Sequence, residues 1–195
     1  MKRVFDLFFS FFGLMFLFPF LLIISLLIML DSKGGVFYRQ LRVGKGGKDF
    51  YIFKFRTMKP NSDKQGLLTV GDRDNRITKI GVFLRKYKID EFPQLINAFI
   101  GDMSIVGPRP EVRKYVDLYN DEQKQVLNLR PGITDYASIE FSRENELLAK
   151  SENPEKTYIE EIMPTKLQLN LKYINEACLQ TDLKIIFKTL KKILC

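Results

Sequence analysis

The strongest hydrophobic pattern in the chain lies at its beginning. From Leu7 to Leu30 the sequence contains no charged residue. As a straight helix this stretch would be about 36 Å long, which is enough to cross the roughly 30 Å hydrocarbon core of a bilayer. A cleavable signal peptide is a poor fit, because the stretch is too long and no small-x-small cleavage pattern follows it. The pattern predicts a membrane segment over residues 1–31.

Two features indicate how this segment meets the membrane. Pro19 lies near its centre, where proline removes a backbone hydrogen bond and clashes with the preceding turn. Basic residues lie on both flanks: Lys2, Arg3, Lys33, Arg39, Arg42, Lys45 and Lys48. The positive-inside tendency therefore places both ends in the cytoplasm. We predict a re-entrant helix–break–helix, with Ser10 or Ser25 helping to pair backbone groups at the break; a simple spanning helix is the alternative.

The end of the chain has a second amphipathic pattern. In DLKIIFKTLKKIL, lysines fall on one helical face and apolar residues on another. The lysines are Lys184, Lys188, Lys191 and Lys192, and the apolar residues are Leu183, Ile186, Phe187, Leu190, Ile193 and Leu194. The pattern predicts an amphipathic helix over 182–195 lying in the headgroup region of a membrane. A surface helix packed on the protein's own core fits equally well.

Between these segments, the pattern predicts one compact unit of helices with a small β-hairpin. Aromatic and β-branched residues flank a glycine-rich connection at 43–47, which is typical of a hairpin. An exposed loop is expected over 59–68, helices over 77–100 (interrupted near Pro93) and 110–129, and a turn at 130–134. The predicted fold is therefore an α/β, mostly helical, membrane-associated domain over residues 32–195, with amphipathic interfacial helices.

Composition narrows the chemistry. The 195 residues suit a single domain, and the net charge of +8 indicates an anionic partner: nucleic acid, a membrane surface or a phosphorylated substrate. Histidine is absent, which excludes Ser-His-Asp hydrolysis and imidazole acid/base catalysis. The two cysteines, Cys178 and Cys195, support neither a disulfide framework nor a thiolate metal site. Carboxylates, basic side chains and an oxygen-ligated divalent metal remain.

Two adjacent carboxylates stand out against this background. Asp90 and Glu91 lie side by side in YKIDEFPQLI, among apolar residues that would remove them from water. Buried carboxylates are costly without a compensating cation or hydrogen-bond network. Basic residues before and after the pair in the sequence could supply the compensating charge: Lys54, Arg56, Arg76, Arg85 and Arg109. A solvated basic surface carrying two ordinary helix carboxylates is the alternative interpretation.

Longer motifs then become recognisable. VFYRQLRVGKGGKDFYIFKFRTM, DNRITKIGVFLRKYKIDEFPQLINAFIGDMSIVGPRPE and RPGIT closely resemble the bacterial sugar transferases called monotopic phosphoglycosyl transferases, nearly end to end and in their minimal catalytic-core form. The resemblance implies a re-entrant protein in one leaflet of the cytoplasmic (inner) membrane, with its catalytic domain facing the cytoplasm. It also implies transfer of a phosphosugar from a UDP-sugar to polyprenyl (undecaprenyl) phosphate, with release of UMP, as a first membrane step of glycoconjugate assembly.

The same resemblance implies roles for particular residues. Asp90 would be the nucleophile that forms a covalent aspartyl-phosphosugar, and Glu91 a ligand of Mg²⁺. Lys54 and Arg109 match phosphate contacts of the family. Further candidates for binding substrate or phosphate are Arg56, Arg85 and Arg130. Phosphoryl transfer depends on positioning and charge neutralisation, so a site without histidine is sufficient.

Alternatives and departures remain at this stage. Polyprenyl phosphate could attack directly in one step, with Asp90 only a metal ligand. A non-catalytic membrane-anchored module that binds anionic ligands would explain the charge, although an acidic pair weakens binding to phosphate backbones, so we expect no nucleic acid. A homodimer is allowed for. Many relatives read RPGITGWAQVNGRN where this chain reads RPGITDYASIEFSREN, which leaves the sugar open.

Overall fold

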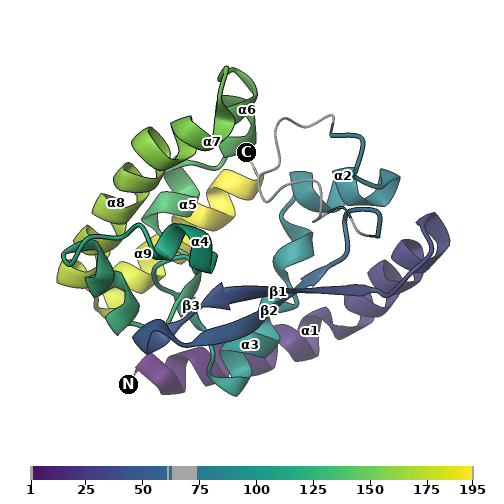
Figure 1. Cartoon of the computed structure of the whole chain (residues 1–195). Helices are drawn as coiled ribbons and strands as arrows, with labels where there is room; N and C mark the ends of the chain where they lie inside the picture. The colour runs from purple at the N-terminus through teal and green to yellow at the C-terminus, as the bar shows by residue number, and fades with distance from the viewer. Residues whose placement is uncertain (1, 61, 63–73, 195) are drawn as a thin grey trace.

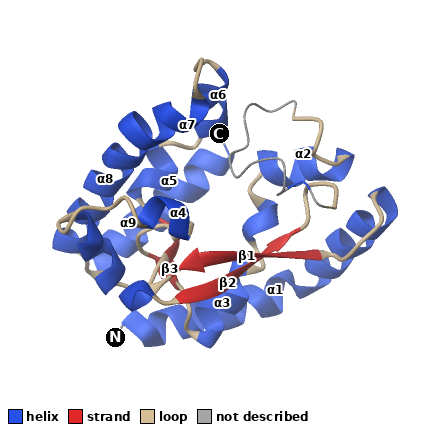
Figure 2. Cartoon of the chain, in the orientation of Figure 1, coloured by secondary structure: helices blue, strands red, loops and turns tan. Residues whose placement is uncertain are grey.

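The computed structural model describes residues 2–60, 62 and 74–194, and this part of the chain is mostly helical with two small sheets (Figures 1 and 2). The helices and helical turns are α1 (Lys2–Asp31), η1 (Lys45–Gly47), α2 (Lys79–Lys86), η3 (Ile89–Glu91), α3 (Gln94–Ile100), α4 (Arg113–Val116), η4 (Gln123–Asn128), α5 (Tyr136–Glu140), α6 (Glu144–Ala149), α7 (Pro154–Thr157), η5 (Tyr158–Ile162), α8 (Met163–Glu176) and α9 (Leu179–Leu194). The strands are β1 (Phe37–Val43), β2 (Asp49–Phe55), β3 (Ser104–Val106) and β4 (Gly132–Thr134). Most of the loop expected over 59–68 lies outside the described residues.

The predicted hairpin is confirmed. Strands β1 and β2 pair antiparallel, with Phe37 opposite Phe55 and Val43 opposite Asp49. The connection needs glycine, because Gly46 and Gly47 have φ angles of 68° and 73°, in the left-handed region that other residues seldom adopt. The hairpin is therefore closed by backbone geometry as well as by the alternation of its strands.

A second, parallel sheet was not expected from the sequence. Strand β3 pairs with β4, with Ser104 opposite Gly132 and Val106 opposite Thr134. The start of β4 lies very close to the residue that follows β3. A Cβ at Gly132 would lie 2.1 Å from the backbone nitrogen of Gly107, so only glycine fits there. This sheet brings the residues after β3 beside those after β4.

The beginning of α1 is anchored to the rest of the chain by polar contacts. Lys2 Nζ lies 2.6 Å from a carboxylate oxygen of Asp182 in α9. Asp6 is buried, and its Oδ1 accepts hydrogen bonds from Ser104 Oγ at 2.9 Å and from the backbone nitrogen of Ile105 at 3.0 Å. Buried carboxylates are stable only with such partners, so α1 is fixed to β3 and α9 at its start.

The remainder of α1 also lies along the domain, beside α3 and below the hairpin in the view of Figure 1. A Cβ at Gly13 would meet the Leu95 side chain at 3.3 Å, which shows how closely α1 approaches α3. Ile28 is fully buried in a cluster with residues of β2 and α2. At the end of the helix, the Asp31 carboxylate accepts a hydrogen bond from the backbone nitrogen of Ile80 at 3.0 Å. Both ends of α1 thus contact the same body.

Helix α1 is long and apolar enough to cross a membrane, as predicted. It is helical from Lys2 to Asp31 with Pro19 inside it, so the helical assignment does not stop at the proline. The hydroxyls of Ser10 and Ser25 donate to carbonyls four residues back, those of Asp6 and Leu21, each at 2.6 Å. They therefore serve their own helical turns and not the backbone around Pro19.

The helix expected over 110–129 forms only as two short pieces, α4 and the 3₁₀ helix η4. Between them, the side chains of Asn120 and Gln123 each accept a hydrogen bond from the other's backbone N–H, at 2.8 Å and 3.0 Å. Such side-chain bonds to the backbone favour helix ends and turns over a continuous helix. Helical periodicity alone did not reveal this break.

The amphipathic C-terminal helix is confirmed as α9, and its faces have different surroundings. Ile185 is fully buried in a cluster with Val106 and Tyr173, so one face packs on the core. On another face Leu183 and Phe187 are exposed, Phe187 at 72%. Packing on the protein's own core is therefore confirmed for one face, whereas a position in the headgroup region stays a prediction, to which the exposed apolar side chains are suited.

Candidate active site

Asp90 and Glu91 lie on the short 3₁₀ helix η3, between α2 and α3. Lys88, which precedes this turn, has a left-handed backbone with φ of 56°, which is uncommon for a residue other than glycine. Pro93 follows at the start of α3 and donates no hydrogen bond. Because successive residues of a 3₁₀ helix point about 120° apart, the two carboxylates face different surroundings.

Glu91 is held by two cations. Its Oε1 accepts a hydrogen bond from Lys54 Nζ at 3.2 Å, and its Oε2 accepts one from Arg109 Nη1 at 3.1 Å. A second guanidinium nitrogen of Arg109 also contacts Oε1, so the arginine binds the carboxylate with two parallel donors. This bidentate arrangement is the stronger and more directional form of an arginine–carboxylate pair.

Asp90 has a different environment. It is only 8% exposed, and its Oδ1 is buried without a hydrogen-bond partner among the described residues. A carboxylate oxygen in this condition is costly to the folded state. The structure therefore separates the adjacent carboxylates into one that is fully partnered and one with an oxygen available to a ligand.

The pKa values of the two groups are displaced in opposite directions. Burial and the neighbouring Glu91 raise the pKa of Asp90 above its ordinary value, although Lys54 and Arg85 counteract this in part. Burial alone would also raise the pKa of Glu91, but Arg109 and Lys54 outweigh it and hold that pKa well below the usual range. Burial lowers the pKa of Lys54 despite the attraction of Glu91. Displaced pKa values of adjacent groups are common at functional sites.

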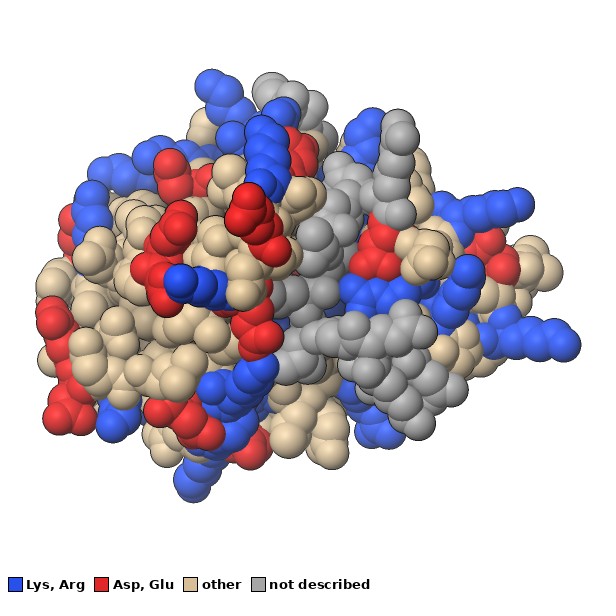
Figure 3. All heavy atoms as spheres, turned by 45° about the horizontal axis from the view of Figure 1, so that its top comes forward, with Lys and Arg blue, Asp and Glu red and all other residues tan. Residues whose placement is uncertain are grey.

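A large cavity opens beside the pair, with a volume of about 1420 Å³. Asp90 and Glu91 line it together with Lys54, Arg85 and Arg109, so the structure brings five of the predicted site residues to one place. In the space-filling view of Figure 3, basic side chains occur at many points of the face shown, with acidic side chains among them. Basic side chains also outnumber acidic ones among the described residues that line the cavity, which favours an anionic ligand.

Two predicted site residues are placed differently. Arg56 lines the same cavity, but its guanidinium donates to backbone carbonyls after α1, including Gly35 O at 2.6 Å, Lys33 O at 2.7 Å and Ser32 O at 2.8 Å. Its side chain thereby closes the turn that joins α1 to the hairpin. Arg130 is exposed and is not among the described residues that line the cavity. Neither arginine is brought to the carboxylate pair.

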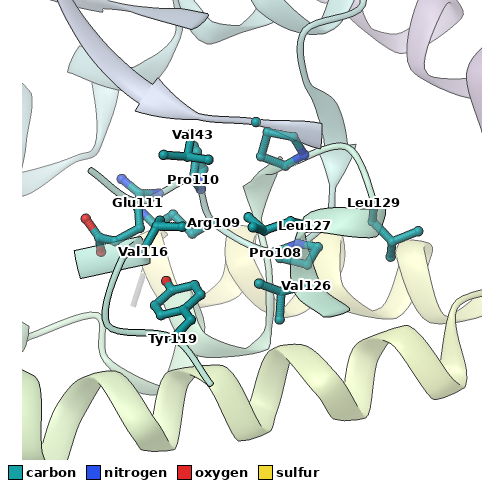
Figure 4. Close-up of a pocket in the computed structure, with 12 residues that line it drawn as sticks. Val43, Pro108, Arg109, Pro110, Glu111, Val116, Tyr119, Val126, Leu127 and Leu129 are labelled. Carbon is teal, nitrogen blue, oxygen red and sulfur yellow. The ribbon is translucent and has the colours of Figure 1, made fainter. Parts of the chain in front are cut away.

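The segment that carries Arg109 is fixed by apolar packing. Figure 4 shows Pro108 and Pro110 among Val43, Tyr119 and Val126, around a small cavity of about 20 Å³. On the other side, the backbone nitrogen of Arg109 donates to Asp135 at 3.2 Å. A rigid segment of this kind sets the direction of the guanidinium toward Glu91.

Sequence reasoning missed two site residues. Lys88 lines the cavity, and its positive charge acts to lower the pKa of both carboxylates, although the net shift of Asp90 is upward. Its place directly before Ile89, Asp90 and Glu91 is the signal by which the sequence could have revealed it. Asp135 is fully buried, accepts from Arg109 N, and caps α5 by accepting from Ser138 N at 2.7 Å. The sequence showed Asp135 only as a departure from related chains, because the β3–β4 sheet that places it was not foreseen.

Comparison with known proteins identifies relatives of the whole chain. The family described as bacterial sugar transferase matches residues 1–195. The chain is 38% identical over 179 residues to the UDP-N-acetylgalactosamine-undecaprenyl-phosphate N-acetylgalactosaminephosphotransferase of Aeromonas hydrophila, which covers 90% of this chain and 39% of that protein. It is 34% identical over 200 residues to the UDP-glucose:undecaprenyl-phosphate glucose-1-phosphate transferase of Escherichia coli (strain K12), over 98% of this chain and 40% of that protein.

A relative of similar length also matches. The exopolysaccharide production protein PSS of Rhizobium leguminosarum bv. phaseoli is 37% identical over 196 residues, which cover 97% of this chain and 92% of that protein. The chain therefore spans about two fifths of the Aeromonas and Escherichia relatives and nearly all of the Rhizobium relative. With the family match over its full length, the chain belongs to the bacterial sugar transferase family.

Proposed function

We propose that the protein transfers a phosphosugar from a UDP-sugar to polyprenyl (undecaprenyl) phosphate, yielding polyprenyl diphosphosugar and UMP. The observation that carries the proposal is Asp90, a buried carboxylate with an unpartnered oxygen on the wall of a large basic cavity. The names of the Aeromonas and Escherichia relatives supply the substrate class, since both pair a UDP-sugar with undecaprenyl phosphate. The sugar differs between them.

In the proposed mechanism Asp90 is the nucleophile. Its carboxylate oxygen attacks the sugar-linked phosphorus of the UDP-sugar, the phosphorus–oxygen bond to UMP breaks, and UMP leaves with that electron pair. A phosphate oxygen of the polyprenyl phosphate then attacks the same phosphorus and displaces the Asp90 carboxylate. A covalent intermediate divides the transfer between two bulky substrates into two simpler steps. The unpartnered oxygen of Asp90 supports this role, because no internal hydrogen bond must be broken before it attacks.

The neighbouring cations support the order of the two steps. Lys54, Arg85 and Arg109 line the cavity beside Asp90, and two of them are already shared with Glu91. A diphosphate and a second phosphate together would bring more negative charge than these groups can neutralise. Release of UMP before the lipid phosphate binds lets the same cations serve each anion in turn.

The carboxylate pair also fits Mg²⁺, which we propose as the cofactor. Glu91 uses three of the roughly four acceptor positions of a carboxylate on Lys54 and Arg109, which leaves one on Oε2. Magnesium commonly takes only one or two protein carboxylates and completes its shell with water and substrate phosphates. Glu91 would hold the ion, which when bound would offset the charge of the diphosphate.

The position of α1 supports a monotopic arrangement in the cytoplasmic membrane. The helix contacts the domain at its start through Asp6, in its middle through Gly13 and at its end through Asp31. A helix that crossed the bilayer away from a cytoplasmic domain would lose most of these contacts. Exposed apolar side chains on α1 and α9, such as Phe16 and Phe187, would face lipid in the same leaflet.

The decisive experiment measures UMP release by purified protein with Mg²⁺, undecaprenyl phosphate and a panel of UDP-sugars. We expect one UDP-sugar to be preferred, EDTA to abolish the reaction, and Asp90→Asn to be inactive while remaining folded. With radiolabelled UMP and no acceptor, label should exchange into the UDP-sugar. Substantial turnover by Asp90→Asn would refute the covalent role, and no UMP from any UDP-sugar would favour a non-catalytic anion-binding module.

A further inference from the structure

Two other buried polar atoms in the cavity wall have no hydrogen-bond partner within the described part of the chain. They are Ser138 Oγ on α5 and Asn170 Oδ1 on α8. Asn170 is only 5% exposed. Buried polar groups in folded proteins nearly always have partners, so each such atom requires an explanation. Gln94 Nε2 is also unpartnered, but Gln94 is not among the described residues that line the cavity.

Both atoms belong to the cavity that contains the catalytic pair. Helix α5 packs against α8, and Ser138 and Asn170 both line the cavity. Ser138 is connected to the pair by a short chain of contacts, because its backbone nitrogen donates to Asp135, which also accepts from the backbone of Arg109. Arg109 in turn binds Glu91. Ser138 is therefore linked to the carboxylate pair through Asp135 and Arg109, and Asn170 lines the same cavity from α8.

Other polar side chains that line the cavity differ from Ser138 and Asn170 because they have partners within the protein. The Lys166 ammonium pairs with Glu144, and the Tyr158 hydroxyl donates to Glu111. The hydroxyls of Thr134 and Thr189 share a hydrogen bond of 2.6 Å. These groups satisfy one another, so a ligand gains little by replacing their contacts. Ser138 and Asn170 instead offer a hydroxyl and an amide oxygen that no described residue satisfies, and a ligand with hydrogen-bonding groups would pair with them.

We propose that Ser138 and Asn170 form the subsite that recognises the sugar of the UDP-sugar, through its hydroxyl or acetamido groups. This inference rests on the proposed function. Both side chains are uncharged, so they suit the neutral hydroxyl or acetamido groups of a sugar better than a phosphate, which arginine and lysine bind more strongly. The names of the relatives share UDP and differ in the sugar. Uncharged hydrogen-bonding side chains are suited to distinguish such sugars.

The test compares Ser138→Ala and Asn170→Leu with matched controls. The controls are Ser151→Ala, since Ser151 bonds Thr157 away from the cavity lining, and Asn175→Ala, an exposed position on α8. For the preferred UDP-sugar, each cavity variant should lower kcat/KM by about threefold to tenfold, the effect of one lost hydrogen bond, and the preference among UDP-sugars should narrow. Melting temperatures should stay equal or rise, because a buried unpartnered polar atom has been removed. The controls should leave kcat/KM and the sugar preference unchanged.

Inhibition by UMP separates the sugar from the nucleotide. The inhibition constant of UMP should be the same in both cavity variants as in the unmodified protein. A parallel weakening of UMP would assign the two residues to the nucleotide and overturn the sugar subsite. Unchanged kcat/KM, or activity lost together with melting temperature, would also overturn it. These results presuppose turnover by the unmodified protein; its absence would instead contradict the proposed function on which the inference rests.

Discussion

Replacing Asp90 by asparagine should stabilise the folded protein, whereas Glu91→Gln should destabilise it. The two changes are chemically alike, since each exchanges a carboxylate for an amide of nearly the same shape. Their surroundings are opposite: Asp90 Oδ1 has no partner among the described residues, while Glu91 pairs with Lys54 and Arg109. Each variant therefore serves as the control for the other.

The expected magnitudes follow from these contacts. A buried polar group without a partner costs about 1–3 kcal/mol, and more when it is charged. An asparagine amide removes the charge that burial and Glu91 penalise, so Asp90→Asn should raise the free energy of unfolding by about 1–2 kcal/mol. Removing one partner of a buried ion pair costs about 3–5 kcal/mol. Since the Arg109 side chain is 33% exposed, we expect the lower end, about 3 kcal/mol, for Glu91→Gln. At about 2–4 °C per kcal/mol for a chain of this size, the melting temperature should rise by about 2–8 °C in one variant and fall by about 6–12 °C in the other.

The dependence on pH has a definite sign for each residue. Because the pKa of Asp90 is raised in the folded state, its ionised form destabilises the protein above that pKa, and this cost disappears as the pH falls toward the ordinary value of 3.8. Because the pKa of Glu91 is lowered, its stabilising contribution is complete above 4.5 and is lost as the pH falls through the folded value. Both differences from the unmodified protein should therefore be largest near neutral pH and shrink in acid.

Differential scanning fluorimetry of the detergent-purified proteins, without substrate or metal, measures both effects across about pH 2 to 8, a range that extends below the ordinary pKa values of both carboxyls. A lower melting temperature for Asp90→Asn at neutral pH would refute the reasoning, since it would mean that the Asp90 carboxylate is stabilised by contacts the structure does not contain. Equal and opposite shifts that did not change with pH would refute the electrostatic explanation.

Three further expectations concern residues outside the pair. Arg56→Ala should lower the free energy of unfolding by about 3 kcal/mol, because it removes the charge-assisted hydrogen bonds that the buried Arg56 donates to carbonyls of the 32–35 turn. Urea unfolding monitored by circular dichroism measures this, and an unchanged midpoint would contradict it. Arg109→Ala should reduce kcat/KM for UMP release by at least 100-fold, because Arg109 binds Glu91 in the site. Arg130 is exposed, so Arg130→Ala should retain most of kcat/KM, and a comparable loss would show that Arg130 acts in the site. Single cysteines at positions 2 and 33, in a background without Cys178 and Cys195, should react only from the cytoplasm; labelling of position 2 from outside intact cells would establish a spanning helix.

Much of this protein was determined by local sequence. The long apolar segment, the hairpin around Gly46 and Gly47 and the amphipathic C-terminal helix all follow from periodicity and turn chemistry, which act between residues close in the chain. The Asp90–Glu91 pair was also visible, because two adjacent charges among apolar residues need compensation wherever they fold. Lys54 and Arg109 could be proposed as that compensation only through the likeness to a family.

The tertiary structure decided which charged groups meet. The parallel pairing of β3 with β4 joins segments far apart in the chain and sets Asp135 against the backbone of Arg109, a contact that periodicity does not encode. The same packing commits Arg56 to the backbone after α1 and leaves Arg130 at the surface. It also gives Glu91 its two cations, whereas one Asp90 oxygen has no partner in the part of the chain that the structure describes. Burial and hydrogen-bond partners depend on non-local contacts, so adjacent carboxylates that are equivalent in the sequence acquire opposite properties only in the folded protein.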